Sequence, residues 1–142
     1  MTHLLIESDA NPRVKRWKRL AADARFLRRE GALLIEGIHL AEVVLEHPDV
    51  KVSAVILSAG RSTNEAAGLA DKLASAKGAK VYVLSDRLYD GISPVENGVG
   101  IMCEVAIPQA PADEAWTHQD ALYLDGVQDS GNAGTFIRSA AA

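Results

Sequence analysis

The sequence predicts an α/β domain with a largely parallel sheet that helices cover on both faces. Short apolar runs of strand length alternate with segments of helical periodicity, as in βαβ units. A composition of 48% hydrophobic and 24% charged residues is that of a folded globular protein. A chain of 142 residues is long enough for one compact domain of ordinary size.

The first predicted helix begins at Asn11 and Pro12, because Asn is a good helix cap and Pro suits the first helical position. Apolar residues then recur at helical spacing and define a side that faces the core. These residues are Val14, Trp17, Leu20, Ala21 and Ala24.

The following elements alternate between strand and helix. A capping box of Ser62 and Glu65 is expected to start the third helix, Gly78 to end it, and Ser85 to cap the fourth. The predicted strands are 32–37, 52–57, 80–84 and 98–105, and the predicted helices after the first are 38–47, 63–76 and 85–90.

The end of the chain is organised differently. Residues 106–120 contain two prolines and little periodicity, which is typical of a linker between a domain at 1–105 and a segment at 121–142. The apolar run 121–127 predicts a buried strand, followed by a Gly-rich turn and a helix from about Asn132. Because that helix stops without an ending signal, we expect a truncated second domain. Its lone strand should pack on a neighbour, exchange between chains or be poorly ordered.

Several classes of protein are disfavoured. The single cysteine, Cys103, excludes an internal disulfide and is expected to be buried. His39, Glu42 and Glu46 share a helix face but are too few for a metal site, so no metal is expected. Without a long apolar run or a signal peptide, we expect a cytoplasmic protein that does not enter membranes.

Positive charge is concentrated at one end of the chain. Residues 1–29 hold eight Lys/Arg and three Asp/Glu, whereas residues 30–142 hold seven and sixteen. Several like charges lie three or four residues apart, which costs about 0.2 to 0.5 kcal/mol per pair. An external polyanion such as RNA or DNA would relieve this repulsion. Alternatively, the segment is a solvated face or pairs with acids further along the chain. The cations are Arg13, Lys15, Arg16, Lys18, Arg19, Arg25, Arg28 and Arg29.

The closing turn also indicates an anion site. A strand, a Gly-rich turn and a helix N-terminus together present backbone N–H groups to a ligand. The spacing of Gly126, Gly131 and Gly134 matches neither a dinucleotide fingerprint nor a P-loop. On the predicted helix Arg138 can reach back toward the strand end, where open α/β sheets bind ligands. A helix cap with a surface Arg is the alternative interpretation.

The same residues resemble a known family. LDGVQDSGNAGTFIRSAAA (124–142) resembles the first motif of the SpoU-type RNA 2′-O-ribose methyltransferases of the SPOUT superfamily, with Ser130 where many members have Pro. Residues 11–37 resemble the start of the family's substrate-binding domain, an α/β/α sandwich like that of certain ribosomal proteins. The motif residues are Asn132, Gly134, Thr135 and Arg138.

This resemblance implies transfer of a methyl group from S-adenosylmethionine to a ribose 2′-hydroxyl of ribosomal or transfer RNA. It also implies a homodimer, and a cofactor held by a C-terminal trefoil knot. We therefore expect this chain to supply RNA binding and the first catalytic motif, to bind no cofactor, and to be inactive alone. Its own oligomeric state stays open. Two alternatives are a free-standing ribosomal-protein-like RNA-binding module without catalysis and another kind of nucleotide-binding enzyme.

The resemblance further implies that Asn132 and Arg138 are active-site residues, with Gly131, Gly134 and Thr135 supporting the turn. A guanidinium is in effect always protonated and is a poor base. Our hypothesis is that Arg138 stays charged, holds the phosphate beside the target ribose and stabilises the developing alkoxide. Asn132 would hold the catalytic loop or the hydroxyl in place.

Overall fold

The protein is represented by a computed structural model that describes residues 2–93, 98–108 and 120–142. The chain divides into two compact units, Met1–Pro108 and Gln109–Ala142. The division falls within the predicted linker 106–120, of which residues 109–119 lie outside the described residues.

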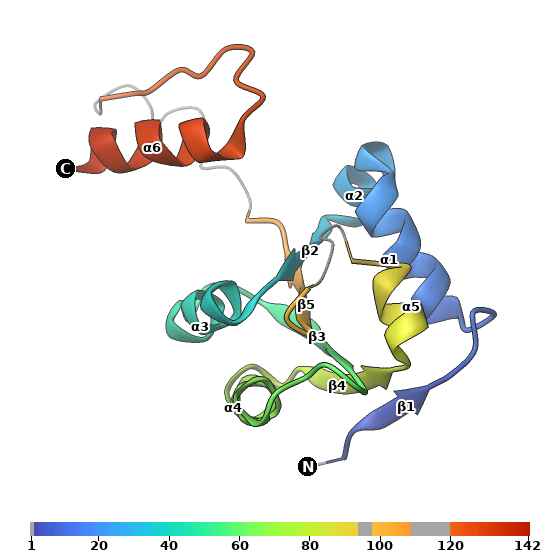
Figure 1. Cartoon of the computed structure of the whole chain (residues 1–142). Coiled ribbons are helices and arrows are strands. Elements are labelled where there is room, and N and C mark those ends of the chain that lie inside the picture. Colours follow the sequence, from blue (N-terminus) through green and yellow to red (C-terminus); the bar gives the residue numbers. More distant parts are fainter. Residues whose placement is uncertain (1, 94–97, 109–119) are drawn as a thin grey trace. The chain divides into compact units, whose positions relative to one another are not determined.

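The first unit is built on a five-stranded sheet with the order β1-β4-β3-β5-β2 (Figure 1). β1, β4 and β3 are parallel to one another, whereas β5 is antiparallel to both of its neighbours, β3 and β2. The α/β class is therefore confirmed, but the expectation of a largely parallel sheet is wrong because the sheet is mixed. The strands are β1 Leu4–Ile6, β2 Ala32–Glu36, β3 Val52–Ser58, β4 Lys80–Leu84 and β5 Ile101–Ala106.

The chain between β4 and β5 carries the short helix α5, Asp86–Asp90. A helix of this length advances the chain by only about 8 Å. β5 starts at the end of the sheet where β4 finishes and runs back between β2 and β3, antiparallel to both.

Strand β1 was not expected from the sequence. It has three residues and pairs with β4, with Leu4 opposite Tyr82 and Ile6 opposite Leu84. Leu4 and Leu5 are exposed, and only Ile6 is buried. Such a short edge strand has no alternation long enough to distinguish it from a loop.

Helices cover both faces of the sheet, as predicted. α1, α2 and α5 lie on one face and α3 and α4 on the other (Figure 1), each with its own apolar core. Trp17 lies in the first core and is 1% exposed, and Cys103 lies in the second, which confirms both predictions of burial. Burial also raises the pKa of the Cys103 thiol to about 12, so the thiol stays protonated at neutral pH. The helices are α1 Pro12–Ala22, α2 Ala24–Glu30, α3 Ile38–Glu46, α4 Asn64–Lys77 and α5 Asp86–Asp90.

The predicted basic helix is two helices. α1 ends at Ala22, and the Asp23 side chain accepts hydrogen bonds from the backbone N–H groups of Arg25 at 2.9 Å and Phe26 at 3.0 Å. Asp23 has an extended backbone, so it caps α2 and cannot also continue α1. The spacing of apolar residues predicted one continuous helix through Asp23. The capping geometry shows that the helix breaks there.

Two other predicted caps also differ. Thr63, one residue after Ser62, caps α4 by accepting from the Ala66 N–H at 3.1 Å. The Ser62 hydroxyl donates instead to the Gly100 carbonyl beside β5. Ser85 precedes α5 but makes no side-chain cap hydrogen bond. Gly78 does end α4, in the left-handed conformation that glycine adopts without strain.

The second unit has no strand in its described residues. The predicted strand 121–127 is wrong, because these residues form no strand and are exposed, Tyr123 by 87%. Helix α6, Ser130–Ala141, begins two residues before the predicted start at Asn132. A groove of about 540 Å³ runs between the segment from Asp120 to Leu124 and the side of α6 that carries Ile137. An apolar run forms a strand only where another strand offers hydrogen-bonding groups.

Candidate functional site

The two N-terminal helices display most of the cations that the sequence singles out. On α1, Val14, Trp17 and Leu20 are at most 2% exposed and fix the inner side of the helix. This turns Lys15 and Arg19 toward solvent. The short helix α2 is anchored by buried Phe26 in the same way.

Half of the eight cations have carboxylate partners within the first unit. Exposed ion pairs of this kind are worth only about 0 to 1 kcal/mol, so an external anion could replace the carboxylate. Arg16 differs, because it binds two carboxylates and holds the pKa of Glu30 below its usual range. The other pairs are Lys18–Asp9 at 3.0 Å, Arg19–Asp23 at 3.7 Å and Arg29–Glu30 at 3.5 Å.

The other four cations are exposed and have no carboxylate partner within the described part of the chain. We call them the free cations, and they are Arg13, Lys15, Arg25 and Arg28. Arg13 also lies over the ring of Tyr82, with 4.9 Å between the guanidinium carbon and the ring centroid. Both helices contribute two free cations, so unpaired positive charge lies on both sides of the break at Asp23.

Sequence reasoning missed Glu104, which lies on β5 and contacts α1. Glu104 is 7% exposed, and its carboxylate accepts hydrogen bonds from Trp17 Nε1 at 2.7 Å and Arg16 Nη2 at 2.9 Å. The signal was present in the sequence, since Glu104 is the one charged residue in the run IMCEVA of β5. A charged residue in a buried strand is rare unless it is paired.

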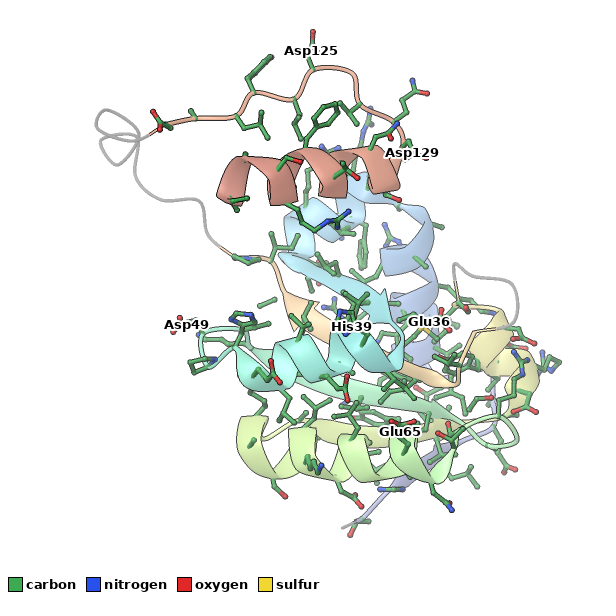
Figure 2. The ribbon with its side chains drawn as sticks, turned by 60° about the vertical axis from the view of Figure 1, so that its left-hand side comes forward. Glu36, His39, Asp49, Glu65, Asp125 and Asp129 are labelled. Atoms are coloured by element: carbon green, nitrogen blue, oxygen red, sulfur yellow. The ribbon has the colours of Figure 1, made fainter. Side chains whose placement is uncertain are left out.

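The second candidate site is the start of α6. The Asp129 side chain accepts from the Asn132 backbone N–H at 2.7 Å and caps the helix (Figure 2). Ser130 is therefore the first helical residue, a position where Pro is well tolerated because its missing N–H is not needed. The serine departs from the family motif without altering this cap.

Arg138 folds back along α6 toward that start. Its Nη2 donates to the Thr135 hydroxyl at 3.3 Å, and the hydroxyl donates to the Gly131 carbonyl at 2.9 Å. A Cβ atom at Gly134 would lie 3.1 Å from Arg138 Nη1, so glycine leaves room for the guanidinium. The structure thus places Arg138 beside Thr135 and Gly134, and Thr135 links it to Gly131. Asn132 lies on the same helix and is exposed.

The groove beside α6 does not fit S-adenosylmethionine. The groove beside α6 is lined by Leu122, Leu124, Ile137 and alanines, and Asp120 is its one charged residue. It offers little to hydrogen-bond an adenine or the amino acid part of the cofactor. In residues 2–93, 98–108 and 120–142, no cluster of three His, Cys, Asp or Glu could hold a metal ion. No helix in these ranges is long and apolar enough to cross a membrane.

Comparison with known proteins points to one family. Residues 11–103 match the MRM3-like substrate binding domain. The 23S rRNA (guanosine(2553)-2′-O)-methyltransferase RlmP of Bacillus subtilis (strain 168) is 30% identical over 137 residues, which are 96% of this chain and 50% of that protein. The chain spans about half the length of the curated relatives it matches.

Solved structures show the same fold. The structure of an RNA 2′-O ribose methyltransferase is similar over 97% of this chain and 52% of the methyltransferase chain, with a TM-score of 0.64 and 20% identity. The SpoU methyltransferase AviRb from Streptomyces viridochromogenes, in complex with AdoMet, matches 79% of this chain and 41% of its own, with a TM-score of 0.60 and 17% identity.

Proposed function

Because the chain belongs to the SpoU methyltransferase family through its MRM3-like substrate-binding domain, we propose that it is the RNA-binding region of an RNA 2′-O-ribose methyltransferase. The substrate is ribosomal or transfer RNA, and the methyl donor is S-adenosylmethionine. The chain also carries the first catalytic motif. A free-standing RNA-binding module remains the alternative.

The observation that supports RNA binding most is the set of four free cations. Arg13 and Lys15 on α1 and Arg25 and Arg28 on α2 are exposed, and carboxylates of the described residues do not neutralise them. Phosphate groups of RNA would supply the missing negative charge.

The test is replacement of all four free cations by Ala, with RNA affinity measured at several salt concentrations. Each lost phosphate contact lowers the slope of log affinity against log salt by about 0.7 to 0.9. If all four free cations contact phosphate, we therefore expect the slope to become shallower by about 3. Unchanged affinity and slope would show that the segment is only a solvated face.

A matched control removes four cations from other elements of the same unit. Lys72 and Lys77 lie on α4, Lys80 begins β4, and Lys51 precedes β3. Replacing these four by Ala changes the net charge equally. We expect this variant to keep most of the affinity, because long-range charge alone is strongly screened by salt.

The catalytic part of the proposal concerns Asn132 and Arg138. Arg138 binds the phosphate beside the target ribose and stabilises the negative charge that develops on the 2′-oxygen. It does not accept the proton, because a guanidinium has no free acceptor. Asn132 holds the catalytic loop or the hydroxyl. Thr135 and Gly134 support this arrangement by keeping Arg138 near the start of α6.

Arg138→Lys tests this role, since lysine keeps the charge and loses the planar fork. In the whole protein that carries this chain, we expect methyl transfer to fall by about 100-fold or more, as for loss of one transition-state donor. Near-normal turnover would refute the assigned role. Arg87→Lys is a control, because Arg87 is an exposed arginine of the first unit that pairs with Asp9.

Three further predictions accompany the function. The cofactor binds to a part of the whole protein other than the described residues, so this chain should neither bind it tightly nor be active alone. The whole enzyme is a homodimer. It works in the cytoplasm.

A further inference from the structure

We propose that Glu104 is the positioning residue of the RNA-binding surface: its carboxylate on β5 holds α1 and α2 in the arrangement that presents the free cations. This inference rests on the proposed RNA binding. It concerns a residue that would not touch the RNA itself.

Both oxygens of the Glu104 carboxylate are engaged by consecutive residues of α1. Oε2 accepts from Trp17 Nε1 at 2.7 Å, and Oε1 accepts from Arg16 Nη2 at 2.9 Å. Trp17 also packs edge-to-face on Tyr82, with ring centroids 5.4 Å apart. Two anchors one residue apart fix the rotation of α1 about its own axis, and this rotation decides where Arg13 and Lys15 point.

Arg16 extends the same connection to α2. Its Nη1 donates to the Glu30 carboxylate, which lies at the end of α2. One guanidinium therefore joins β5, α1 and α2 across the break at Asp23. The Arg19 guanidinium, 4.0 Å from the centroid of the Phe26 ring, is a second contact between the two helices.

The sign of the charge argues against a simple electrostatic role. A carboxylate behind a positive surface repels RNA, so Glu104 weakens binding through space. A buried ion pair is also weak evidence for stability, because desolvation offsets the attraction. The remaining contribution of Glu104 is to fix one arrangement of the helices, as buried polar groups do in some proteins.

The experiment compares Glu104→Gln with the wild-type chain. The glutamine amide has no charge and only one oxygen that can accept. Its NH₂ group would face either Trp17 Nε1 or Arg16 Nη2, both of which are donors, so only one of these two hydrogen bonds can persist. All variants carry Trp116→Phe, which leaves Trp17 as the sole tryptophan. Its fluorescence and urea unfolding establish that each variant is folded. In folded protein we expect RNA affinity about tenfold lower and a salt slope smaller by about 1, as for one lost phosphate contact.

Equal or tighter RNA binding by folded Glu104→Gln would overturn the inference, since a through-space charge effect predicts that result. Arg16→Lys decides the matter if Glu104→Gln does not fold. The Arg16 side chain is 33% exposed, and lysine keeps the charge but cannot join Glu104 and Glu30 through two nitrogens. We expect this variant also to bind RNA more weakly, and unchanged binding would overturn the inference.

Leu73→Ala is the matched control for lost stability. Leu73 is fully buried in the core on the opposite face of the sheet, so the change destabilises the unit without touching α1. Folded Leu73→Ala should bind RNA as the wild type does; an equal loss would show that Glu104 acts only through stability. Absence of salt-dependent RNA binding by the wild-type chain would instead refute the proposed RNA binding itself.

Discussion

The two units treat similar apolar sequence in opposite ways. In the first unit, the strand Val52–Ser58 has β4 on one side and β5 on the other, and Ile56 is fully buried. In the described part of the second unit, residues 121–127 form no strand and have none to pair with, and Leu122 is 50% exposed. Apolar runs thus indicate which residues can enter a core, and neighbouring strands decide whether they do.

The same difference applies to the helices. α1 has a buried side because the sheet and α5 lie against it. α6 has no buried residue, and its Phe136 and Ile137 are 50% and 57% exposed. The site in the first unit is therefore held by a core, whereas the contacts of Arg138 among the described residues lie within its own helix.

The largest expected effect tests this difference directly. Trp17→Ala removes a side chain that is 1% exposed, together with its hydrogen bond to Glu104. We expect the free energy of unfolding of the first unit to fall by about 3 to 5 kcal/mol. Urea unfolding followed by far-UV circular dichroism measures it.

Phe136→Ala is the counterpart in the second unit. Because Phe136 is half exposed, we expect a change within about 0.5 kcal/mol. A loss comparable to that of Trp17→Ala would mean that the second unit contributes a packed core to the chain, and would remove the contrast between the two.

A smaller effect concerns the dependence of stability on pH. Asp86 accepts hydrogen bonds from the Ser58 hydroxyl at 2.6 Å and the Gly60 N–H at 2.8 Å. Both hydrogen bonds lower the pKa of Asp86 from its ordinary value of 3.8, and the bond from Ser58 has the larger effect. A lowered folded-state pKa contributes stability that is present above the unfolded-state pKa and is lost as pH falls through the folded-state pKa.

Asp86→Asn should therefore be less stable than the wild type at pH 7, with a difference that shrinks as the pH falls below about 3.8. Urea unfolding at a series of pH values measures this difference. Asp125→Asn, at an exposed position of the second unit (Figure 2), is the control and should change the free energy of unfolding at pH 7 by no more than about 0.5 kcal/mol. A difference for Asp86→Asn that stays constant down to acid pH would assign the effect to packing rather than to the carboxylate.

Local sequence signals predicted much of the fold. The strand 80–84 forms with the predicted bounds, and Gly78 ends α4. Trp17 lies in the core because helical spacing places it beside Val14 and Leu20. In each case the determining interaction lies within about one helical turn or one strand, so the order of residues is sufficient.

The closing motif is local in the same sense. Thr135 and Arg138 meet because residues three apart on a helix are neighbours, and Gly134 leaves room for the guanidinium. The sequence therefore determined which side chains this motif brings together. Their assignment as a catalytic site stays a prediction.

Only the tertiary structure decided which of the eight N-terminal cations are paired. Arg16 meets Glu104, 88 residues away, because β5 runs back between β2 and β3 and brings its carboxylate under α1. Arg13 and Lys15, on the same helix, meet no carboxylate of the described residues. Charge and spacing are properties of the chain, but ion pairing depends on which distant strands lie beneath a helix, and strand order is settled only when the sheet forms.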